Sequence, residues 1–460
     1  MRSTRTRAML AMTSVAAFGL LAACGSGVAR SASSGPGGSH VTLDVVSLKP
    51  GSEDSAFKAF AAQVAQFEVA NPDITIKSHE YEWTGPTFAA QLAGGTLPDV
   101  FTIPFTDGKT LIENKQLANL DAQFQKLPYA KSFNPNVLQA GQGQDGKVYG
   151  IPYAAYGIGL QYNRALFTQA GLDPDKPPTT WAEVRADAKQ IAEKTGQSGY
   201  ATMSQSNTGG WQLTVATYAR GGRVETVNGK KATATLDNSA TKASLEYLKK
   251  LRWDDNSMGS NFLYDWASIN QAFAAGQIGM YTGGSDVYTS LVTSNAIKPA
   301  DYGLTTLPLA GKDSGVLGGG TLAAVNAKAS DQVKAAAVKW IDFYYMKKLT
   351  DQDAAVLDAK TLSEAKQPVG TPSLPIFDRA AYDRSLVWIK DYVNIPTAQV
   401  QSFNDGIFDQ PLVAEPSRST QALYAALDTV VQAVLTDKNA DIDALLAKAN
   451  TDVQALLDRG

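Results

Sequence analysis

Residues 146–167 read GKVYGIPYAAYGIGLQYNRALF and carry most of the information on how the chain is organised. The Asp145-Gly146 pair at their start is a strong turn signal. An apolar, extended run follows that is too rich in glycine and aromatic residues to predict a helix, and a new element starts at Asn163-Arg164. Alone, this pattern fits one buried strand followed by a helix. Together with its flanking segments, it indicates that the chain here leaves one lobe and enters a second, and a cleft between lobes is a natural ligand site.

The N-terminus has the pattern of a secretory signal. Three arginines precede an apolar run over residues 8–23 that is too short for a stop-transfer helix, so we assign residues 1–23 to a signal peptide. Leu21-Ala22-Ala23-Cys24 resembles the bacterial lipobox, in which the cysteine is lipidated and becomes the new N-terminus. The alternative is a plain signal peptide with an incidental Cys24. We expect a lipid anchor at Cys24, a Gly/Ser-rich tether over 24–40, and a protein on the extracellular face of the cell membrane.

Composition excludes several classes of protein. The chain has 460 residues, which is enough for two or three domains. Its single cysteine excludes a disulfide framework, and its two histidines leave little room for a histidine metal site or a Ser-His-Asp triad. A formal net charge of −3 without a basic patch argues against nucleic acid as a partner. We expect no cofactor and no metal.

The first part of the mature chain alternates strand and helix patterns. Strands are predicted over 41–48, 74–81 and 98–103, with apolar residues at helical spacing between the first two. This order opens a parallel α/β sheet. Further helices are expected over 87–93 and 109–116, after a Thr180 cap, from 240 and 268, over 333–344, and twice near the C-terminus, and Gly318–Gly320 precede a predicted strand over 321–325.

Several short motifs occur in a specific order: GGTLPDV over 94–100, Tyr162-Asn163, Ala170-Gly171-Leu172, PTTW over 178–181, AFAAGQIGM over 272–280, and Leu307-Pro308 ahead of the glycines at 318–320. In this order they resemble the extracellular solute-binding proteins of ABC importers, in the branch that carries the maltose-binding protein. The resemblance implies an α/β, two-lobe fold like that of periplasmic binding proteins, with hinge crossovers and a ligand cleft. We expect the first lobe to comprise 41–153 and 309–366, and the second 154–308 and 367–460.

The same resemblance implies a function. We expect a monomeric, lipid-anchored receptor, not an enzyme, that captures a carbohydrate by closure of its lobes and delivers it to the permease subunits of an ABC importer. One alternative is a non-sugar solute such as a polyamine, a peptide or a phosphorylated compound; for a phosphate, Arg220 and Arg223 are the basic candidates. Another is a secreted glycoside hydrolase, which needs two carboxylates ~5–9 Å apart.

Sugars present apolar faces to aromatic rings and hydroxyls to planar polar groups, which directs the choice of site residues. In the first lobe, Asp54 and Ser55 follow the first strand, where ligands gather, although either could instead cap a helix. Asp107 follows the 98–103 strand, where proteins of the resembled family often place a ligand contact, although it could be a plain surface carboxylate. Trp83 and Trp266 stand in polar loops, as ligand contacts or as parts of a packed cluster.

Three further candidates follow from the resemblance. Tyr156 lies in the crossover where the maltose-binding protein has an acidic side chain, so the chemistry here departs from that relative. Trp211 falls where the family places a stacking aromatic, with lobe core as the alternative, and Asp286 is a predicted cleft contact or an N-cap. Gly319 is a candidate because glycine would admit a ligand close to the backbone, or it could form a simple turn. Trp253 and Trp340 are predicted to be core residues, and Trp181 to be core or to pack at the start of a helix.

Overall fold

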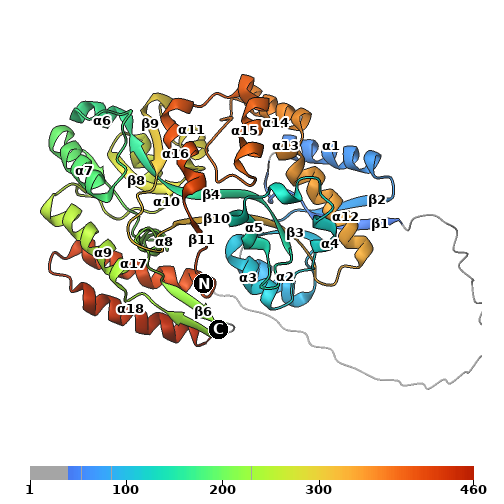
Figure 1. Cartoon of the computed structure of the whole chain (residues 1–460), viewed down its shortest axis with the longest axis horizontal. Coiled ribbons are helices and arrows are strands. Elements are labelled where there is room, and N and C mark those ends of the chain that lie inside the picture. Colours follow the sequence, from blue (N-terminus) through green and yellow to red (C-terminus); the bar gives the residue numbers. More distant parts are fainter. Residues whose placement is uncertain (1–39, 53, 84, 229–230, 460) are drawn as a thin grey trace, which may run out of the picture. The chain divides into compact units, whose positions relative to one another are not determined.

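Three parallel strands and the helices between them open the fold. The computed structural model describes residues 40–52, 54–83, 85–228 and 231–459, without the side chains of residues 55, 85 and 86; Cys24, the predicted signal peptide and most of the predicted tether lie outside it (Figure 1). β1 (Val41–Val46) pairs in parallel with β2 (Ile74–His79) and with β3 (Val100–Pro104). α1 (Asp54–Ala70) and α2 (Gly85–Gly94) connect them. The predicted opening of the sheet is confirmed.

Two long strands carry the chain across the sheet. The first part of β4 (Gly150–Asn163) pairs antiparallel with β10 (Val316–Val325), and its last part pairs with β8 (Ile278–Gly284) and β9 (Tyr302–Thr306). β10 also pairs with β3, so the strand order is β2-β1-β3-β10-β4-β8-β5, with β5 at Ser198–Tyr200. β4 therefore belongs to both sides of the sheet, as residues 146–167 predict (Figure 1).

The glycines before residue 321 form no turn. The alternative interpretation of Gly318–Gly320 as a simple turn is wrong, because these residues lie inside β10. A Cβ at Gly318 would stand 2.8 Å from the carbonyl oxygen of Tyr156 and would overlap Leu412. Leu412 belongs to β11 (Leu412–Val413), which pairs with the start of β10. Close packing of neighbouring strands, and not a change of direction, requires glycine here.

Helices cover both sides of the sheet (Figure 1). α3 (Phe105–Glu113) starts directly at the end of β3, four residues earlier than predicted. The predicted Thr180 cap is confirmed: Thr180 Oγ1 accepts from the Glu183 amide at 3.2 Å, and the Glu183 carboxylate accepts from the Thr180 amide at 3.0 Å. The remaining α-helices of six or more residues are α6 (Arg164–Ala170), α7 (Trp181–Thr195), α8 (Thr208–Tyr218), α9 (Ser239–Lys249), α10 (Trp266–Ala274), α11 (Val287–Thr293), α12 (Asp331–Ile341), α14 (Gln352–Glu364), α15 (Arg379–Ile389), α16 (Gln401–Gly406), α17 (Thr420–Thr436) and α18 (Ile442–Leu457).

Shorter elements complete the list: α4 (Asp121–Phe124), α5 (Pro135–Leu138), α13 (Lys347–Thr350), and the hairpin of β6 (Glu225–Asn228) with β7 (Lys231–Ala234). Among the residues described, no helix has both the length and the apolar character needed to cross a membrane.

Aromatic packing fixes α1 and α12 against each other. Trp340 of α12 is fully buried, and its ring lies 5.2 Å from that of Phe67 and 6.1 Å from that of Phe60, both in edge-on arrangements. The prediction that Trp340 is a core residue is confirmed. Trp181 and Trp253 are only half-buried, so they are not fully core residues, although the Trp253 indole donates to the carbonyl oxygen of Val434 at 2.9 Å.

Candidate functional site

The N-terminal turn of α8 is anchored to α17, which fixes Trp211. The carboxylate of Asp428 on α17 accepts from the backbone amides of Asn207 at 2.6 Å and Gly210 at 2.8 Å, as a capping residue does within its own helix. A Cβ at Gly210 would overlap the backbone of Tyr424, so only glycine lets the two helices approach this closely. Trp211 thus lies in the first turn of α8.

Glu415 binds this tryptophan. Glu415 follows β11, its Oε1 accepts from the Tyr424 hydroxyl at 3.0 Å, and its carboxylate also accepts a hydrogen bond from the Trp211 side chain. Burial raises the pKa of Glu415 to about 7, because the charged form loses water, and the two hydrogen bonds offset only part of this effect. Glu415 can therefore be either an acid or a carboxylate near neutral pH.

Tyr156 and Asp286 lie beside Glu415. Burial raises the pKa of Tyr156, and the negative charges of Glu415 and Asp286 raise it further, which places both acids near its hydroxyl. Asp286 is exposed to water, yet enough protein surrounds it to raise its pKa through desolvation. An exposed side chain that lies in a recess of the protein surface shows both of these properties. Asp286 stands at the N-cap position of α11, as the alternative reading expected, but its side chain makes no capping hydrogen bond.

A buried amide positions the turn that carries Asp286. Nε2 of Gln161 donates to the carbonyl oxygens of Gly283 at 3.3 Å and Gly284 at 3.2 Å, and Oε1 of Gln161 accepts from the Tyr302 hydroxyl at 2.7 Å. Because Gln161 lies in β4, the crossing strand fixes both Tyr156 and the approach to Asp286.

Gly319 makes room for a side chain of the protein itself. It pairs with Tyr156 across the two crossing strands, and a Cβ at Gly319 would overlap the Tyr156 hydroxyl. The next glycine, Gly320, serves Phe105 in the same way, since its Cβ would stand 2.7 Å from the Phe105 ring. Phe105 is the first residue of α3, so two successive glycines of β10 lie beside both parts of the site.

The second part of the site surrounds Asp107, in the first turn of α3. The carboxylate of Asp107 accepts a hydrogen bond from the Trp83 side chain, and burial nevertheless raises its pKa. Its charge in turn raises the pKa of Tyr81, whose hydroxyl donates to the Thr102 carbonyl oxygen at 3.2 Å. Tyr153 of β4 also raises the pKa of Tyr81, so this group too adjoins a crossing strand.

The structure thus gathers most of the predicted site residues into two groups. We call Tyr156, Trp211, Asp286, Gly319 and Glu415 the Glu415 group, and Trp83, Asp107 and Tyr81 the Asp107 group. Among the described residues, no hydrogen bond, ion pair or ring contact joins Asp54 or Trp266 to either group; both are exposed, at the first positions of α1 and α10. Ser55 lies in the first turn of α1, and its side chain is outside the described part.

Sequence reasoning missed Glu415, Tyr424 and Tyr81. Only the pairing of β11 with β10 and the packing of α17 on α8 bring Glu415 to Trp211. Within the described ranges, no cluster of three or more His, Cys, Asp or Glu could hold a metal ion. The site instead combines aromatic faces with carboxyl groups whose pKa values are raised by burial, which suits a polar, uncharged ligand.

Comparison with known proteins identifies relatives of this chain. A family model described as bacterial extracellular solute-binding protein matches residues 62–358. A protein of Brucella abortus, named as a binding protein, is 26% identical over 253 residues, which cover 53% of this chain and 57% of that protein. The sn-glycerol-3-phosphate-binding periplasmic protein UgpB of Yersinia pestis is 27% identical over 156 residues, 32% of this chain and 34% of UgpB. The chain thus matches little more than half of the first relative and a third of the second.

Solved structures share the fold across almost the whole chain. The cyclic alpha-maltosyl-1,6-maltose binding protein of Arthrobacter globiformis superposes with a TM-score of 0.68 at 22% identity, covering 91% of this chain and 99% of that one. UgpB of Mycobacterium tuberculosis, in complex with glycerophosphocholine, gives 0.67 at 20% identity, with 91% and 98% covered. The predicted fold, two α/β lobes joined by crossover strands, is confirmed. The chain belongs to the family of bacterial extracellular solute-binding proteins.

Proposed function

We propose that this protein is the solute receptor of an ABC importer, which captures a mono- or oligosaccharide between its two lobes and delivers it to the membrane permease. In this proposal the lobes comprise 41–153 with 309–366 and 154–308 with 367–460, and the crossing strands β4 and β10 join them. Among solved relatives at about 20% identity, one is a cyclic alpha-maltosyl-1,6-maltose binding protein, one holds alpha-D-tagatose and one holds D-mannitol. Those ligands support a carbohydrate here.

The observation that carries the proposal is the Trp211–Glu415 pair. Because Glu415 already binds the indole N–H, Trp211 offers a ligand its ring face and not a hydrogen bond. A ring face suits the C–H face of a sugar. Glu415, with a pKa of about 7, can accept or donate hydrogen bonds, and the Asp286 carboxylate oxygens accept them, as sugar hydroxyls require.

The same groups argue against an anionic solute as the second candidate. The UgpB relatives make a glycerophosphate or a glycerophosphodiester the specific alternative. A phosphate would need a free Arg or Lys beside the Glu415 group. Arg418 is ion-paired with Glu113 at 2.9 Å, and Arg223 donates to two backbone carbonyls. A phosphate there would face Glu415 and Asp286 instead.

Thermal unfolding of the chain from residue 25 onward, with a panel of solutes, tests the proposal. A ligand at a hundred times its dissociation constant should add ~2.7 kcal/mol of stability and raise the unfolding midpoint. The panel contains mono- and oligosaccharides, sn-glycerol 3-phosphate, glycerophosphocholine, polyamines and peptides. A rise with one class of sugar supports the proposal. A rise with only the phosphorylated compounds, polyamines or peptides keeps the receptor and rejects the carbohydrate.

We also propose that the protein binds its solute without chemical turnover. It would be a monomer held at the extracellular face of the cell membrane by lipid on Cys24. Product analysis after long incubation with the identified oligosaccharide tests the first part. Any hydrolysis that disappears in Glu415→Gln or Asp286→Asn would instead favour a glycosidase.

A further inference from the structure

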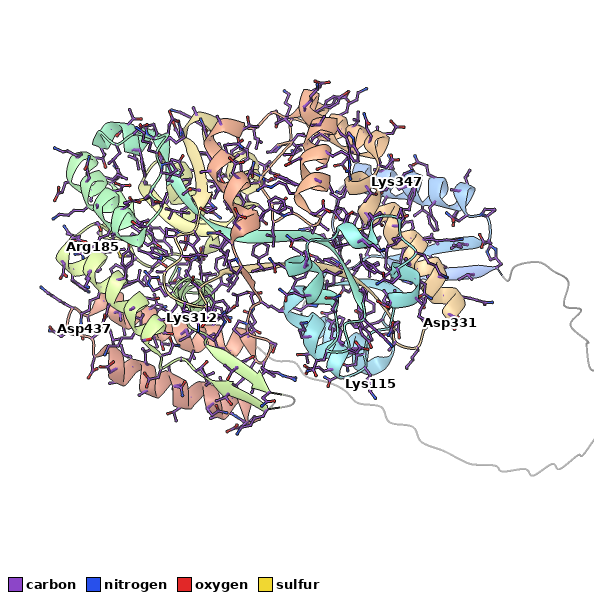
Figure 2. The ribbon with its side chains drawn as sticks, viewed as in Figure 1. Lys115, Arg185, Lys312, Asp331, Lys347 and Asp437 are labelled. Atoms are coloured by element: carbon purple, nitrogen blue, oxygen red, sulfur yellow. The ribbon has the colours of Figure 1, made fainter. Side chains whose placement is uncertain are left out.

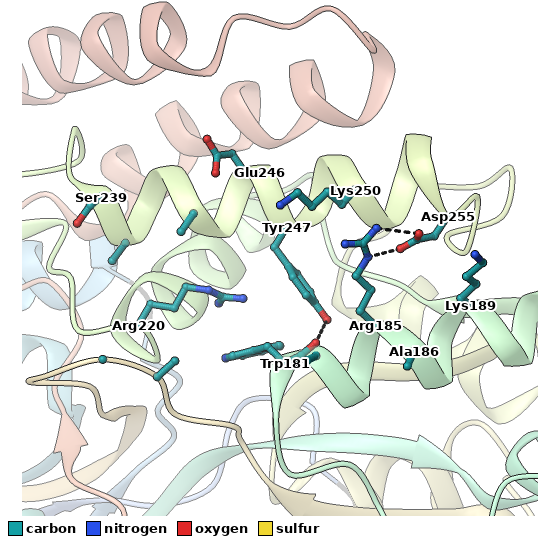
Figure 3. A pocket seen from close by; sticks show the side chains of 15 residues that line it. Trp181, Arg185, Ala186, Lys189, Arg220, Ser239, Glu246, Tyr247, Lys250 and Asp255 are labelled. Carbon is teal, nitrogen blue, oxygen red and sulfur yellow. Dashed lines mark hydrogen bonds and ion pairs between the residues drawn. The ribbon is translucent and has the colours of Figure 1, made fainter.

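A cavity of about 880 Å³ lies between α7 and α9, apart from both groups of the candidate site (Figure 3). Trp181 and Arg185 of α7 line it from one helix, and Ser239 and Tyr247 of α9 from the other. Arg220, just after α8, completes the wall (Figure 3). No member of the Glu415 group or the Asp107 group lines this cavity. Its volume falls within the range of small-molecule sites, roughly 300–1,000 Å³.

Arg220 is a cation without a counter-ion at the base of this cavity. Its guanidinium carbon lies 4.3 Å from the centre of the Trp181 ring and 5.1 Å from that of Tyr247. One of its five donors bonds the Ala216 carbonyl oxygen at 3.1 Å, and within the described ranges no carboxylate comes within ion-pair distance of it. Burial lowers the pKa of Arg220 because the charge is withdrawn from water. A withdrawn charge without a partner is costly, and two ring faces offset that cost only in part.

The rest of the wall adds donors and positive charge. Nε1 of Trp181, beside Arg220, is a buried donor with no hydrogen-bond partner among the described residues. Lys250 also lines the cavity, whereas Lys189 is ion-paired with Glu193 at 3.9 Å and Arg185 with Asp255; Figure 3 shows the second pair. Four basic and two acidic side chains in the lining leave a net charge of 4 − 2 = +2. Alanines 182, 186, 240, 243 and 310 make the remaining wall apolar.

We propose that this cavity is a second ligand site, which takes a small organic anion whose carboxylate or phosphate pairs with Arg220 and whose apolar body lies along the alanines and the Trp181 and Tyr247 rings. The planar fork of arginine matches both kinds of anion with two parallel hydrogen bonds. The site is independent of the carbohydrate site, since the two share no residue.

Calorimetric titration of the purified protein tests this site with three probes of similar shape: benzoate, phenyl phosphate and the uncharged benzyl alcohol. We expect at least one of the two anions to bind and to raise the unfolding midpoint, and benzyl alcohol to do neither. Tighter binding of benzoate would assign the site to carboxylates, and tighter binding of phenyl phosphate to phosphates. Loss of one hydrogen-bonded charge should weaken binding by about tenfold or more, so Arg220→Met should abolish the effect of the anion.

A matched control uses another half-buried arginine. Arg252 lies 5.0 Å from the ring of Trp253 and 4.9 Å from that of Phe262 and does not line the cavity, so Arg252→Met should leave anion binding unchanged. Without an anion, Arg220→Met should unfold no earlier than the wild type, because it removes an unpaired buried charge. Lys250 is exposed, and Lys250→Glu should weaken binding severalfold even if Arg220→Met does not fold.

Any of four results would overturn the proposal. The first is that neither anion binds at millimolar concentration, and the second is that benzyl alcohol binds as tightly as the anions. The third and fourth are that the Lys250→Glu variant, or a folded Arg220→Met variant, binds the anions as the wild type does.

Discussion

Replacing Glu415 by glutamine should remove a pH-dependent loss of stability. In the folded protein the pKa of Glu415 is about 7, against an ordinary value of 4.5. Between these values the folded chain holds a proton that the unfolded chain has released, so the free energy of unfolding falls as pH rises from about 4.5 to 7. The difference of about 2.5 pH units corresponds to a loss of up to about 3 kcal/mol, at 1.36 kcal/mol per unit.

Glutamine has nearly the same shape and carries no charge. We therefore expect Glu415→Gln to match the wild type near pH 5 and to exceed it at pH 8 by up to about 3 kcal/mol. Urea unfolding of both proteins at several pH values measures this difference. Glu364→Gln, which removes an exposed carboxylate from α14, controls for the loss of one acid. A constant gap between wild type and Glu415→Gln from pH 5 to pH 8 would refute the reasoning.

Three further predictions concern the site and the anchor. Trp211→Ala should weaken binding of the identified sugar by about tenfold, since stacking contributes on the order of 1 kcal/mol beyond buried area, and Trp211→Phe should lose less; calorimetry decides, and equal affinities would remove Trp211 from the site. Gly319→Ala should cost about 1–3 kcal/mol by displacing Tyr156, whereas Gly94→Ala, whose Cβ would meet nothing closer than 3.8 Å, should change stability by less than about 1 kcal/mol; urea midpoints test both. Cys24→Ala should move the protein from the membrane fraction to the medium, as immunoblots of the two fractions would show, and an unchanged distribution would contradict lipidation.

Local patterns were enough to predict the elements that depend on local chemistry. The Thr180 capping box and the strand-helix-strand opening rest on residues within a few positions of one another, and both are confirmed. The prediction that residues 146–167 cross between the two lobes also rests on a local pattern, a long apolar run without helical spacing. In the structure this run is the 14-residue strand β4, whose two ends pair with different strands.

Features that depend on distant neighbours could not be predicted in this way. Gly318–Gly320 look like a turn in isolation, and only Tyr156, Phe105 and Leu412, which press against them, show why a strand needs glycine there. Glu415 lies between Pro411 and Pro416, at a position without regular secondary structure, and no neighbouring sequence pattern identifies it as a site residue. Its role follows from Trp211 and Tyr424, which α8 and α17 bring to it.

The two groups of the candidate site are mechanically connected, which constrains how a ligand could close the lobes. α3, which carries Asp107, contacts the segment that carries Glu415: Thr110 donates to the Ser417 carbonyl oxygen at 3.2 Å, and Arg418 pairs with Glu113. The Arg418 and Glu113 side chains are 23% and 31% exposed, so their ion pair contributes at most about 1 kcal/mol and breaks at small cost.

These contacts alone cannot hold one arrangement of the lobes. Shifting a two-state equilibrium from 1:99 to 99:1 requires about 5.5 kcal/mol of differential binding, and a single stacking or hydrogen-bond contact supplies on the order of 1 kcal/mol. A ligand that touched only the Glu415 group would bind both arrangements equally and shift nothing. Under the proposed function, a sugar that closes the lobes would have to contact the Glu415 group on one side and the Asp107 group on the other. We therefore expect substitutions in either group to reduce closure as well as affinity.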